Sequence, residues 1–205
     1  MSLIISDGKS TVKIIYNKYF KFNKIIKEKI SKTIKCFNLR NYINKNKLYL
    51  ELNLYFTNFL IDKLLLFFQE CPVHVKDIDV IGLHGNTIYH NPLEKISLQI
   101  GDSKKLAIEF NKPVVCDFRQ KDILNGGQGA PLAPIFHKAV FKHKNLPTMV
   151  VNIGGISNFT YIDGKKLISS DIGPGNVLID NYCKKKFGKD FDNEGKLSKK
   201  GKILE

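Results

Sequence analysis

Residues 148–187 decide the fold class, and they read TMVVNIGGISNFTYIDGKKLISSDIGPGNVLIDNYCKKKF. Short runs of apolar and β-branched residues alternate here with glycine-bearing turns, a pattern typical of strands joined by hairpins. The stretch predicts three strands at 148–153, 158–162 and 166–169, turns at Gly154-Gly155 and Asp163-Gly164, and a helix at 177–187. A strand meander followed by a helix is therefore expected in this part of the chain.

The start of the chain repeats this order of elements. Two strands are expected at 3–5 and 11–16 around an Asp7-Gly8-Lys9 turn, and isoleucines at helical spacing from Ile25 to Ile34 predict a helix after them. A second helix is expected over 48–68, after a loop rich in Asn and Lys. The repeat predicts two copies of one architecture with a boundary near residue 146, so that residues 1–145 form a first domain and residues 146–205 begin a second.

The middle of the chain alternates short apolar runs with helix candidates. Strands are expected within 80–85, 96–101 and 113–118, and helices over 103–110 and 131–143. Alternating strands and helices indicate an α/β sheet, and ligands of such folds collect where the strands end.

Composition excludes several classes of protein. A chain of 205 residues with 43% hydrophobic residues can fill a core, so disorder throughout is excluded. The net charge of +14 comes almost entirely from Lys, with Arg40 and Arg119 as the only arginines, and Lys reads bases and phosphates less well than Arg. Basicity is therefore weak evidence for a polyanionic partner.

The cysteines and the N-terminus favour a reduced, cytoplasmic protein. No C-x-x-C pair occurs, so neither a disulfide scaffold nor a thiolate zinc site is indicated. Residues 1–7 lack the pattern of a signal peptide. The apolar stretch 48–68 carries polar interruptions such as Glu51 and Asp62, so it is expected to be a buried helix rather than a membrane span.

Two polar segments of the first half are candidates for chemistry. Residues 84–90, HGNTIYH, are expected to form a loop whose histidines could shuttle protons or bind an anion, or could be structural hydrogen-bonding groups. The segment 117–131 joins Asp117 and Arg119 to a glycine loop, GGQGAP, that leads into a helix. Its free N–H groups would suit a phosphate or a sugar carboxylate, and the alternative is a long surface loop.

Two further segments lie in the second half. Residues 152–158, NIGGISN, could bring phosphate close to backbone N–H groups, or could be an ordinary Gly-Gly hairpin. Residues 171–176, DIGPGN, place a carboxylate at an expected strand end, where Asp171 could be a general base or a magnesium-shell ligand. The same segment is also explained as the start of a helix.

Taken in order, six motifs resemble the motif series of the anhydro-N-acetylmuramic acid kinases. The resemblance spans roughly residues 77–201, and the order of the motifs makes it specific. The motifs are His84-Gly85-Asn86-Thr87, Leu98-Gln99-Ile100-Gly101-Asp102, Asp117-Phe118-Arg119, Gly126-Gly127-Gln128-Gly129-Ala130-Pro131-Leu132, Asn152-Ile153-Gly154-Gly155-Ile156-Ser157-Asn158 and Asp171-Ile172-Gly173-Pro174-Gly175-Asn176.

The resemblance implies a cytoplasmic sugar kinase with the α/β ATPase fold of actin and hexokinase. Members open the 1,6-anhydro ring of anhydro-N-acetylmuramic acid with water and phosphorylate the freed O6, giving N-acetylmuramic acid 6-phosphate during cell-wall recycling. ATP and Mg²⁺ are the implied cofactors. The implied partners are the amino sugar and ATP, without nucleic acid or membrane, and a homodimer is compatible with the resemblance.

The resemblance also assigns roles to residues. Asp171 matches the family's catalytic base, and no residue is assigned as a metal ligand. The implied nucleotide-binding residues are Asn152, Gly154, Gly155, Ser157, Asn158 and Gly173. The implied sugar-binding residues are His84, Asp117, Arg119, Gly127, Gln128 and Asn176.

The chain departs from the family pattern at both ends. The family's leading strand, with its Ser-Gly-Thr-Ser-x-Asp-Gly hairpin, is missing, and so is its adenosine-binding remainder. The first domain is therefore expected to be incomplete at its N-terminus and the second truncated, and the chain alone is expected to be inactive. The alternative function is a non-catalytic fragment whose Lys-rich surface binds polyanions non-specifically.

Overall fold

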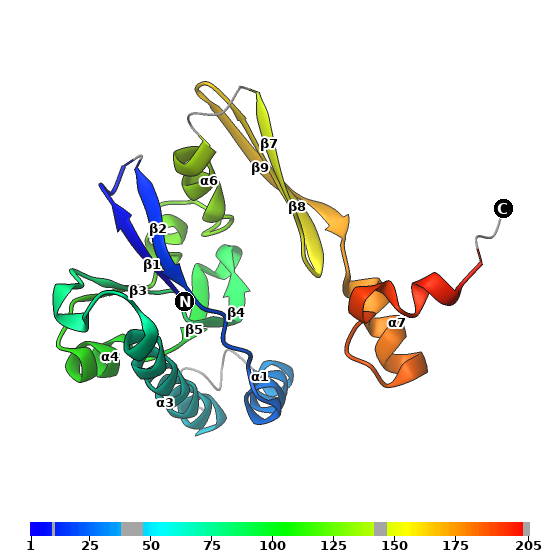
Figure 1. The fold of residues 1–205 in the computed structure, drawn as a ribbon, viewed down its shortest axis with the longest axis horizontal. Helices are drawn as coiled ribbons and strands as arrows, with labels where there is room; N and C mark the ends of the chain where they lie inside the picture. The colour runs from blue at the N-terminus through cyan, green and yellow to red at the C-terminus, as the bar shows by residue number, and fades with distance from the viewer. Residues whose placement is uncertain (10, 38–46, 142–146, 203–205) are drawn as a thin grey trace. The chain divides into compact units, whose positions relative to one another are not determined.

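The computed structural model describes residues 1–9, 11–37, 47–141 and 147–202 (Figure 1). These residues form two compact units, each described by itself below. The first unit holds the described residues of 1–7 and 12–132, and the second holds 8–11 and the described residues from Ala133 onward. The boundary expected at residue 146 lies outside the described residues and stays a prediction.

The first unit opens with the predicted hairpin and helices. Strands β1 (Ser2–Ser6) and β2 (Val12–Asn17) pair antiparallel. Helix α1 (Lys24–Cys36) begins after Asn23, whose side chain accepts a hydrogen bond from the Ile26 N–H at 2.8 Å. Helix α3 (Lys47–Glu70) contains the whole of the predicted 48–68 helix. Helical spacing of apolar residues therefore predicted both helices correctly.

The strands of the middle region form two separate pairs. Strands β3 (Ile81–Leu83) and β6 (Val114–Cys116) run parallel, whereas β4 (Asn86–Asn91) and β5 (Ile96–Ile100) run antiparallel. The expected loop over 84–90 is thus wrong for most of its length, because residues 86–91 pair with β5. Helix α4 (Ser103–Phe110) matches its predicted bounds, and α5 (Gln120–Leu124) interrupts what was expected to be a long loop.

Helix α3 supports both strand pairs through two hydrophobic clusters. The first cluster combines α1, α3, β4 and β5, and the second combines α3 with α4 and the flanks of β3 and β6. The buried members are Ile26, Leu52, Phe56, Ile88 and Ile100 in the first cluster and Ile61, Leu106 and Phe110 in the second. Each such side chain contributes about 1.5–3 kcal/mol by leaving water. The described helices include none that is long and apolar enough to cross a membrane.

Two polar residues of α3 hold the end of β5 in place. The Asn53 Oδ1 accepts a hydrogen bond from the Gly101 N–H at 2.7 Å, and the fully buried Thr57 Oγ1 accepts one from the Asp102 N–H at 2.9 Å. Thr57 in turn donates to the Asn53 carbonyl at 2.7 Å. Because buried backbone N–H groups require partners, these side chains determine where β5 ends.

The second unit contains the predicted meander. Strands β7 (Thr148–Ile153), β8 (Ile156–Asp163) and β9 (Lys166–Pro174) form an antiparallel sheet in the order β7-β8-β9. Helix α7 (Val177–Phe187) follows, with its predicted bounds. Strand β9 is longer than predicted, since it continues through residues 170–174 beside β8.

Helix α6 (Ala133–Phe141) packs on this sheet within the second unit. The His137 Nδ1 lies 2.9 Å from the Oγ1 of Thr160, which is buried on β8. The helix begins two residues later than predicted, and its predicted end at residue 143 lies outside the described residues.

Candidate functional site

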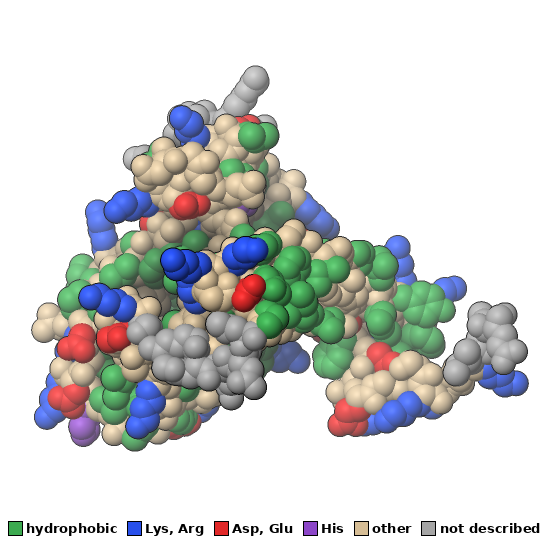
Figure 2. Space-filling model, turned by 90° about the horizontal axis from the view of Figure 1, so that it is seen from above, with side chains coloured by type: hydrophobic (Ala, Val, Ile, Leu, Met, Phe, Trp, Pro, Cys, Tyr) green, Lys and Arg blue, Asp and Glu red, His purple; other side chains and the backbone are tan. Residues whose placement is uncertain are grey.

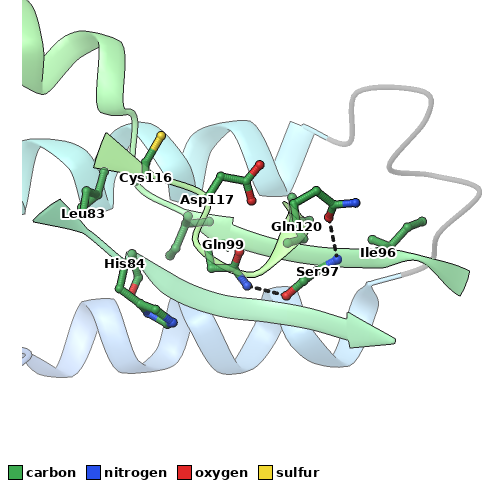
Figure 3. A pocket seen from close by; sticks show the side chains of 12 residues that line it. Leu83, His84, Ile96, Ser97, Gln99, Cys116, Asp117 and Gln120 are labelled. Carbon is green, nitrogen blue, oxygen red and sulfur yellow. Dashed lines mark hydrogen bonds between the residues drawn. The ribbon is translucent and has the colours of Figure 1, made fainter. Parts of the chain in front are cut away.

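A cavity of about 390 Å³ lies at the carboxyl ends of β3 and β6, beside β5. His84 directly follows β3 and Asp117 directly follows β6, and both residues line the cavity. The expectation that polar residues gather where parallel strands end is therefore confirmed for these two. Figure 3 shows Leu83 and His84 at one end of the cavity and Ile96 at the other.

Amide side chains organise the wall of the cavity. The Gln99 Nε2 donates to the Ser97 Oγ at 2.7 Å, and the Gln120 Oε1 accepts from the Ser97 N–H at 3.4 Å (Figure 3). The Gln120 Nε2 also donates to the Lys95 carbonyl at 2.8 Å, which ties α5 to β5. Sequence reasoning did not assign Ser97, Gln99 or Gln120 to the site, although Gln99 belongs to a quoted motif. Only the pairing of β4 with β5 and the packing of α5 place them here.

Asp117 contributes the only carboxylate among the residues that line this cavity. Its backbone is left-handed, with φ of +58°, a conformation that Asp adopts more readily than most residues. The strained turn places Asp117 immediately after β6. Burial raises the pKa of the Asp117 carboxyl, because desolvation disfavours its charged form.

Arg119 contacts the cavity through His84. Its Nε and Nη2 lie 3.1 and 2.9 Å from the His84 Nε2, while the His84 Nδ1 lies 3.1 Å from the Gly85 carbonyl. A carbonyl can only accept, so Nδ1 carries the hydrogen and Nε2 accepts from the guanidinium. Burial lowers the pKa of Arg119. The His84 Nε2 is thus an acceptor here, and Arg119 is not among the residues that line the cavity.

The glycine loop differs from its predicted role as an anion-binding loop. The Gly127 N–H donates to the Asp122 carbonyl at 2.8 Å, and the Gly129 N–H donates to the Asp122 Oδ2 at 2.7 Å. The Gly126 N–H donates to the Ile123 carbonyl at 3.1 Å. The expectation of free N–H groups is therefore wrong at these three glycines, because α5 and its Asp122 use them. Sugar binding by Gly127 and Gln128 stays a prediction.

In the second unit, the strand register gathers the predicted nucleotide-binding residues. Asn152 on β7 lies opposite Asn158 on β8, and Asn158 lies opposite Asp171 on β9. Residues directly opposite each other share a face of a sheet, so these three side chains form one polar row. Ser157 lies opposite Gly173 beyond a register shift. Asp171 is inside β9 rather than at its end, because β9 continues to Pro174.

The Gly154-Gly155 hairpin is bonded to the start of α7. The Gly155 carbonyl accepts from the Gly175 N–H at 2.8 Å and from the Val177 N–H at 3.2 Å, and the Gly154 carbonyl accepts from the Asn176 N–H at 2.7 Å. The Asn176 Nδ2 also donates to the Ile153 carbonyl at 3.3 Å. Asn176 therefore lies with the predicted nucleotide-binding residues, and its sugar-binding role stays a prediction.

The fold and the site define a mixed α/β protein with a ligand-sized cavity at parallel strand ends, lined in part by polar side chains, and a glycine hairpin joined to a helix start. The family model for anhydro-N-acetylmuramic acid kinase matches residues 2–205. The chain belongs to the anhydro-N-acetylmuramic acid kinase family.

Curated relatives carry the same name. The anhydro-N-acetylmuramic acid kinase of Pelagibacter ubique (strain HTCC1062) is 42% identical over 100% of this chain and 55% of its own length. That of Rhodopseudomonas palustris (strain ATCC BAA-98 / CGA009) is 50% identical over 62% of this chain and 35% of its own length. That of Hydrogenovibrio crunogenus (strain DSM 25203 / XCL-2) is 45% identical over 66% of this chain and 37% of its own length. The chain thus spans about half the length, or less, of these relatives.

Proposed function

We propose that this chain serves in an ATP-dependent kinase that opens the ring of 1,6-anhydro-N-acetylmuramic acid and produces N-acetylmuramic acid 6-phosphate. The observation that carries the proposal is the family match over residues 2–205, with relatives of that name at 42–50% identity. The cavity at the ends of β3 and β6 supports it, because a pocket of about 390 Å³ with a largely apolar wall and a few polar side chains suits a ligand the size of an amino sugar.

The first unit would hold the sugar. Asp117 and Gln99 offer an acceptor carboxylate and an amide within one cavity, and such groups bind sugar hydroxyls and an N-acetyl group. His84 presents an imidazole whose Nε2 is held by Arg119. We propose His84, Asp117, Arg119, Gly127 and Gln128 as the sugar-binding residues of the first unit. The sugar-binding role of Asn176, which lies in the second unit, is a separate proposal.

The polar row of the second unit would hold the nucleotide phosphates and supply the base. Neither a positive φ nor a tight contact with the described residues requires glycine at 154 or 155. Their missing side chains would instead leave room for a phosphate near backbone N–H groups. We propose Asn152, Gly154, Gly155, Ser157, Asn158 and Gly173 as nucleotide-binding residues.

Asp171 would accept the proton of the attacking water. The water oxygen bonds to the anomeric carbon, the bond between that carbon and O6 breaks, and O6 takes the phosphoryl group that bound ATP supplies. Asp171 is exposed within β9, with an amide side chain opposite it at Asn158. A base at this position is expected to be reachable by water.

The carboxylate and amide oxygens of the polar row fit Mg²⁺, which keeps several waters and binds through phosphates and one or two carboxylates. Among the described residues no group of three or more His, Cys, Asp or Glu could hold a metal ion. Mg²⁺ would be held mainly by the nucleotide phosphates, and Asp171 is the one carboxylate that the row offers near them.

The finer features of the family belong to the same proposal. We propose the actin- and hexokinase-like ATPase fold, with residues 1–145 in a first and 146–205 in a second domain, a cytoplasmic role in cell-wall recycling, and a homodimer. The polyanion-binding alternative is not favoured by the family match. On the visible face, Lys and Arg side chains are scattered rather than gathered into one patch (Figure 2).

The test is an isotope-labelled activity assay. A purified protein that carries this chain extended to the length of its relatives is incubated with ATP, Mg²⁺ and anhydro-N-acetylmuramic acid in ¹⁸O-water, and the product is analysed by mass spectrometry. We expect ADP release that depends on the sugar, and one ¹⁸O atom at the anomeric hydroxyl rather than on the phosphate. Sugar-independent ADP release, or label on the phosphate, would contradict the proposal.

A further inference from the structure

Asp122 occupies the interior of the glycine loop. Its Oδ2 accepts from the Gly129 N–H at 2.7 Å and its carbonyl accepts from the Gly127 N–H at 2.8 Å. The side chain and the backbone of one residue thus bind both ends of the Gly127-Gln128-Gly129 segment. The loop is closed around a carboxylate of its own chain, in the way that such loops close around a bound anion.

The glycines of the loop are explained by this carboxylate and by α5. A β-carbon on Gly127 would lie 2.2 Å from the Asp122 Oδ2, far inside van der Waals contact. Gly129 has a φ of +66°, and a β-carbon there would lie 2.8 Å from the Ile123 side chain. A side chain at position 127 would therefore displace the Asp122 carboxylate, and one at position 129 would displace Ile123 and adopt a strained positive φ.

The loop connects Asp122 to the cavity through Arg119. Gly129 donates its N–H to Asp122, and its carbonyl accepts from the Arg119 Nη1 at 2.8 Å. The other two nitrogens of the same guanidinium contact the His84 Nε2, and His84 lines the cavity. A continuous chain of hydrogen bonds thus runs from Asp122 through Gly129 and Arg119 to His84.

We propose that Asp122 is a positioning residue for the sugar site: its carboxylate closes the glycine loop so that the Gly129 carbonyl aims Arg119 at His84. The Arg119 guanidinium has three donor nitrogens, and the Gly129 carbonyl fixes one of them, Nη1. Without that contact the guanidinium can rotate, and His84 loses the donor that holds its Nε2 as an acceptor. The sugar-binding part of this inference rests on the proposed function, whereas the positioning part does not.

The test compares Asp122→Ala with Asp102→Ala. Asp102 is a matched control, because its carboxylate also accepts from two backbone N–H groups, those of Lys104 and Lys105 at 2.9 and 3.0 Å. It caps α4 and makes no hydrogen bond with Arg119 among the described residues. Asp122→Asn is a milder variant that keeps one acceptor oxygen for the Gly129 N–H.

The first readout is ¹⁵N NMR of the His84 imidazole and of the Arg119 Nε–H, which needs no sugar. We expect the wild-type protein to show a single Nδ1–H tautomer and a protected Arg119 Nε–H. Asp122→Ala should lose both signatures, Asp122→Asn should weaken them, and Asp102→Ala should keep them. Formate added to Asp122→Ala should restore them, since it can fill the emptied carboxylate position.

The second readout is the affinity for anhydro-N-acetylmuramic acid. We expect Asp122→Ala to weaken binding about 10-fold or more, as loss of a hydrogen bond to a charged group commonly does, and formate to recover most of the loss. Wild-type signals in both Asp122 variants, or equal changes in Asp102→Ala, would overturn the positioning role. Failure of the wild-type protein to bind the sugar would count against the proposed function alone, because the NMR comparison would still decide the positioning role.

Discussion

Two glycines meet where the Gly154-Gly155 hairpin contacts the start of α7. Gly175 is required by the packing, whereas Gly155 is proposed to bind a ligand. A β-carbon on Gly175 would lie 2.3 Å from the Gly154 carbonyl oxygen and 2.8 Å from the Ser157 Oγ. On Gly155 the nearest heavy atom would be 3.9 Å away, in ordinary van der Waals contact. Gly175→Ala and Gly155→Ala therefore make the same chemical change with and without a clash.

The magnitudes follow from these contacts. Gly175→Ala must separate the hairpin from α7, which costs about 1–3 kcal/mol as overpacking. It also strains hydrogen bonds that contribute about 0.5–1.5 kcal/mol each. The bonds at risk are those donated by Gly175, Asn176 and Val177. We expect a loss of several kcal/mol, which is large against the roughly 5–15 kcal/mol that stabilises a typical domain.

Gly155→Ala should leave the free energy of unfolding within about 1 kcal/mol of the wild-type value. It should nevertheless weaken ATP binding about 10-fold or more, because a methyl group would stand between a phosphate and the backbone N–H groups. Thermal melting and ATP titration of both variants provide the measurement. Wild-type ATP affinity in Gly155→Ala would refute the proposed phosphate site, and equal destabilisation by the two variants would refute the clash argument.

Three further changes test other parts of the site. In a protein extended to the length of its relatives, Asp171→Asn should keep nucleotide binding and reduce turnover about 10²- to 10⁴-fold in a steady-state assay, the usual loss for a positioned base; near-normal turnover would exclude Asp171. The raised pKa of Asp117 means that the folded state binds more protons than the unfolded state just above pH 3.8, so the free energy of unfolding falls as pH rises through that window. Asp117→Asn should therefore be more stable than the wild-type protein at neutral pH and equal to it below pH 3.8, as measured by urea unfolding. Asn53→Ala should cost about 1–3 kcal/mol in the same assay, because the Gly101 N–H loses its acceptor, whereas Asn58→Ala on α3 removes only an exposed hydrogen bond from the Lys105 Nζ and should cost under about 1 kcal/mol. Equal losses in these two variants would contradict the role assigned to Asn53.

Elements with a strong local pattern were predictable from the sequence. The bounds of α4, α7 and β7 agree with those predicted, because helical periodicity, β-branched runs and glycine turns act within a few residues. The six motifs, taken in order, also indicated the family, and the family match over residues 2–205 confirms that prediction. The order of the three strands in the second unit was likewise predictable from its two glycine-bearing turns.

Pairing between distant segments was decided by the tertiary structure. Residues 86–91 look like a polar loop locally, yet they form β4 because β5 supplies their hydrogen-bond partners. The row of Asn152, Asn158 and Asp171 depends on strand register, which the types of residue alone do not determine.

The glycine loop shows the same limit at the scale of one side chain. From the sequence, the run from Gly126 to Gly129 indicated N–H groups open to a ligand. In the structure, the Asp122 carbonyl and carboxylate accept from two of these N–H groups. The Gly129 carbonyl in turn accepts from Arg119, which donates to His84. The sequence determined which residues could bind an anion there. Only the folded chain decided that the anion is Asp122, because the short helix α5 brings its carboxylate within hydrogen-bond distance of the Gly129 N–H.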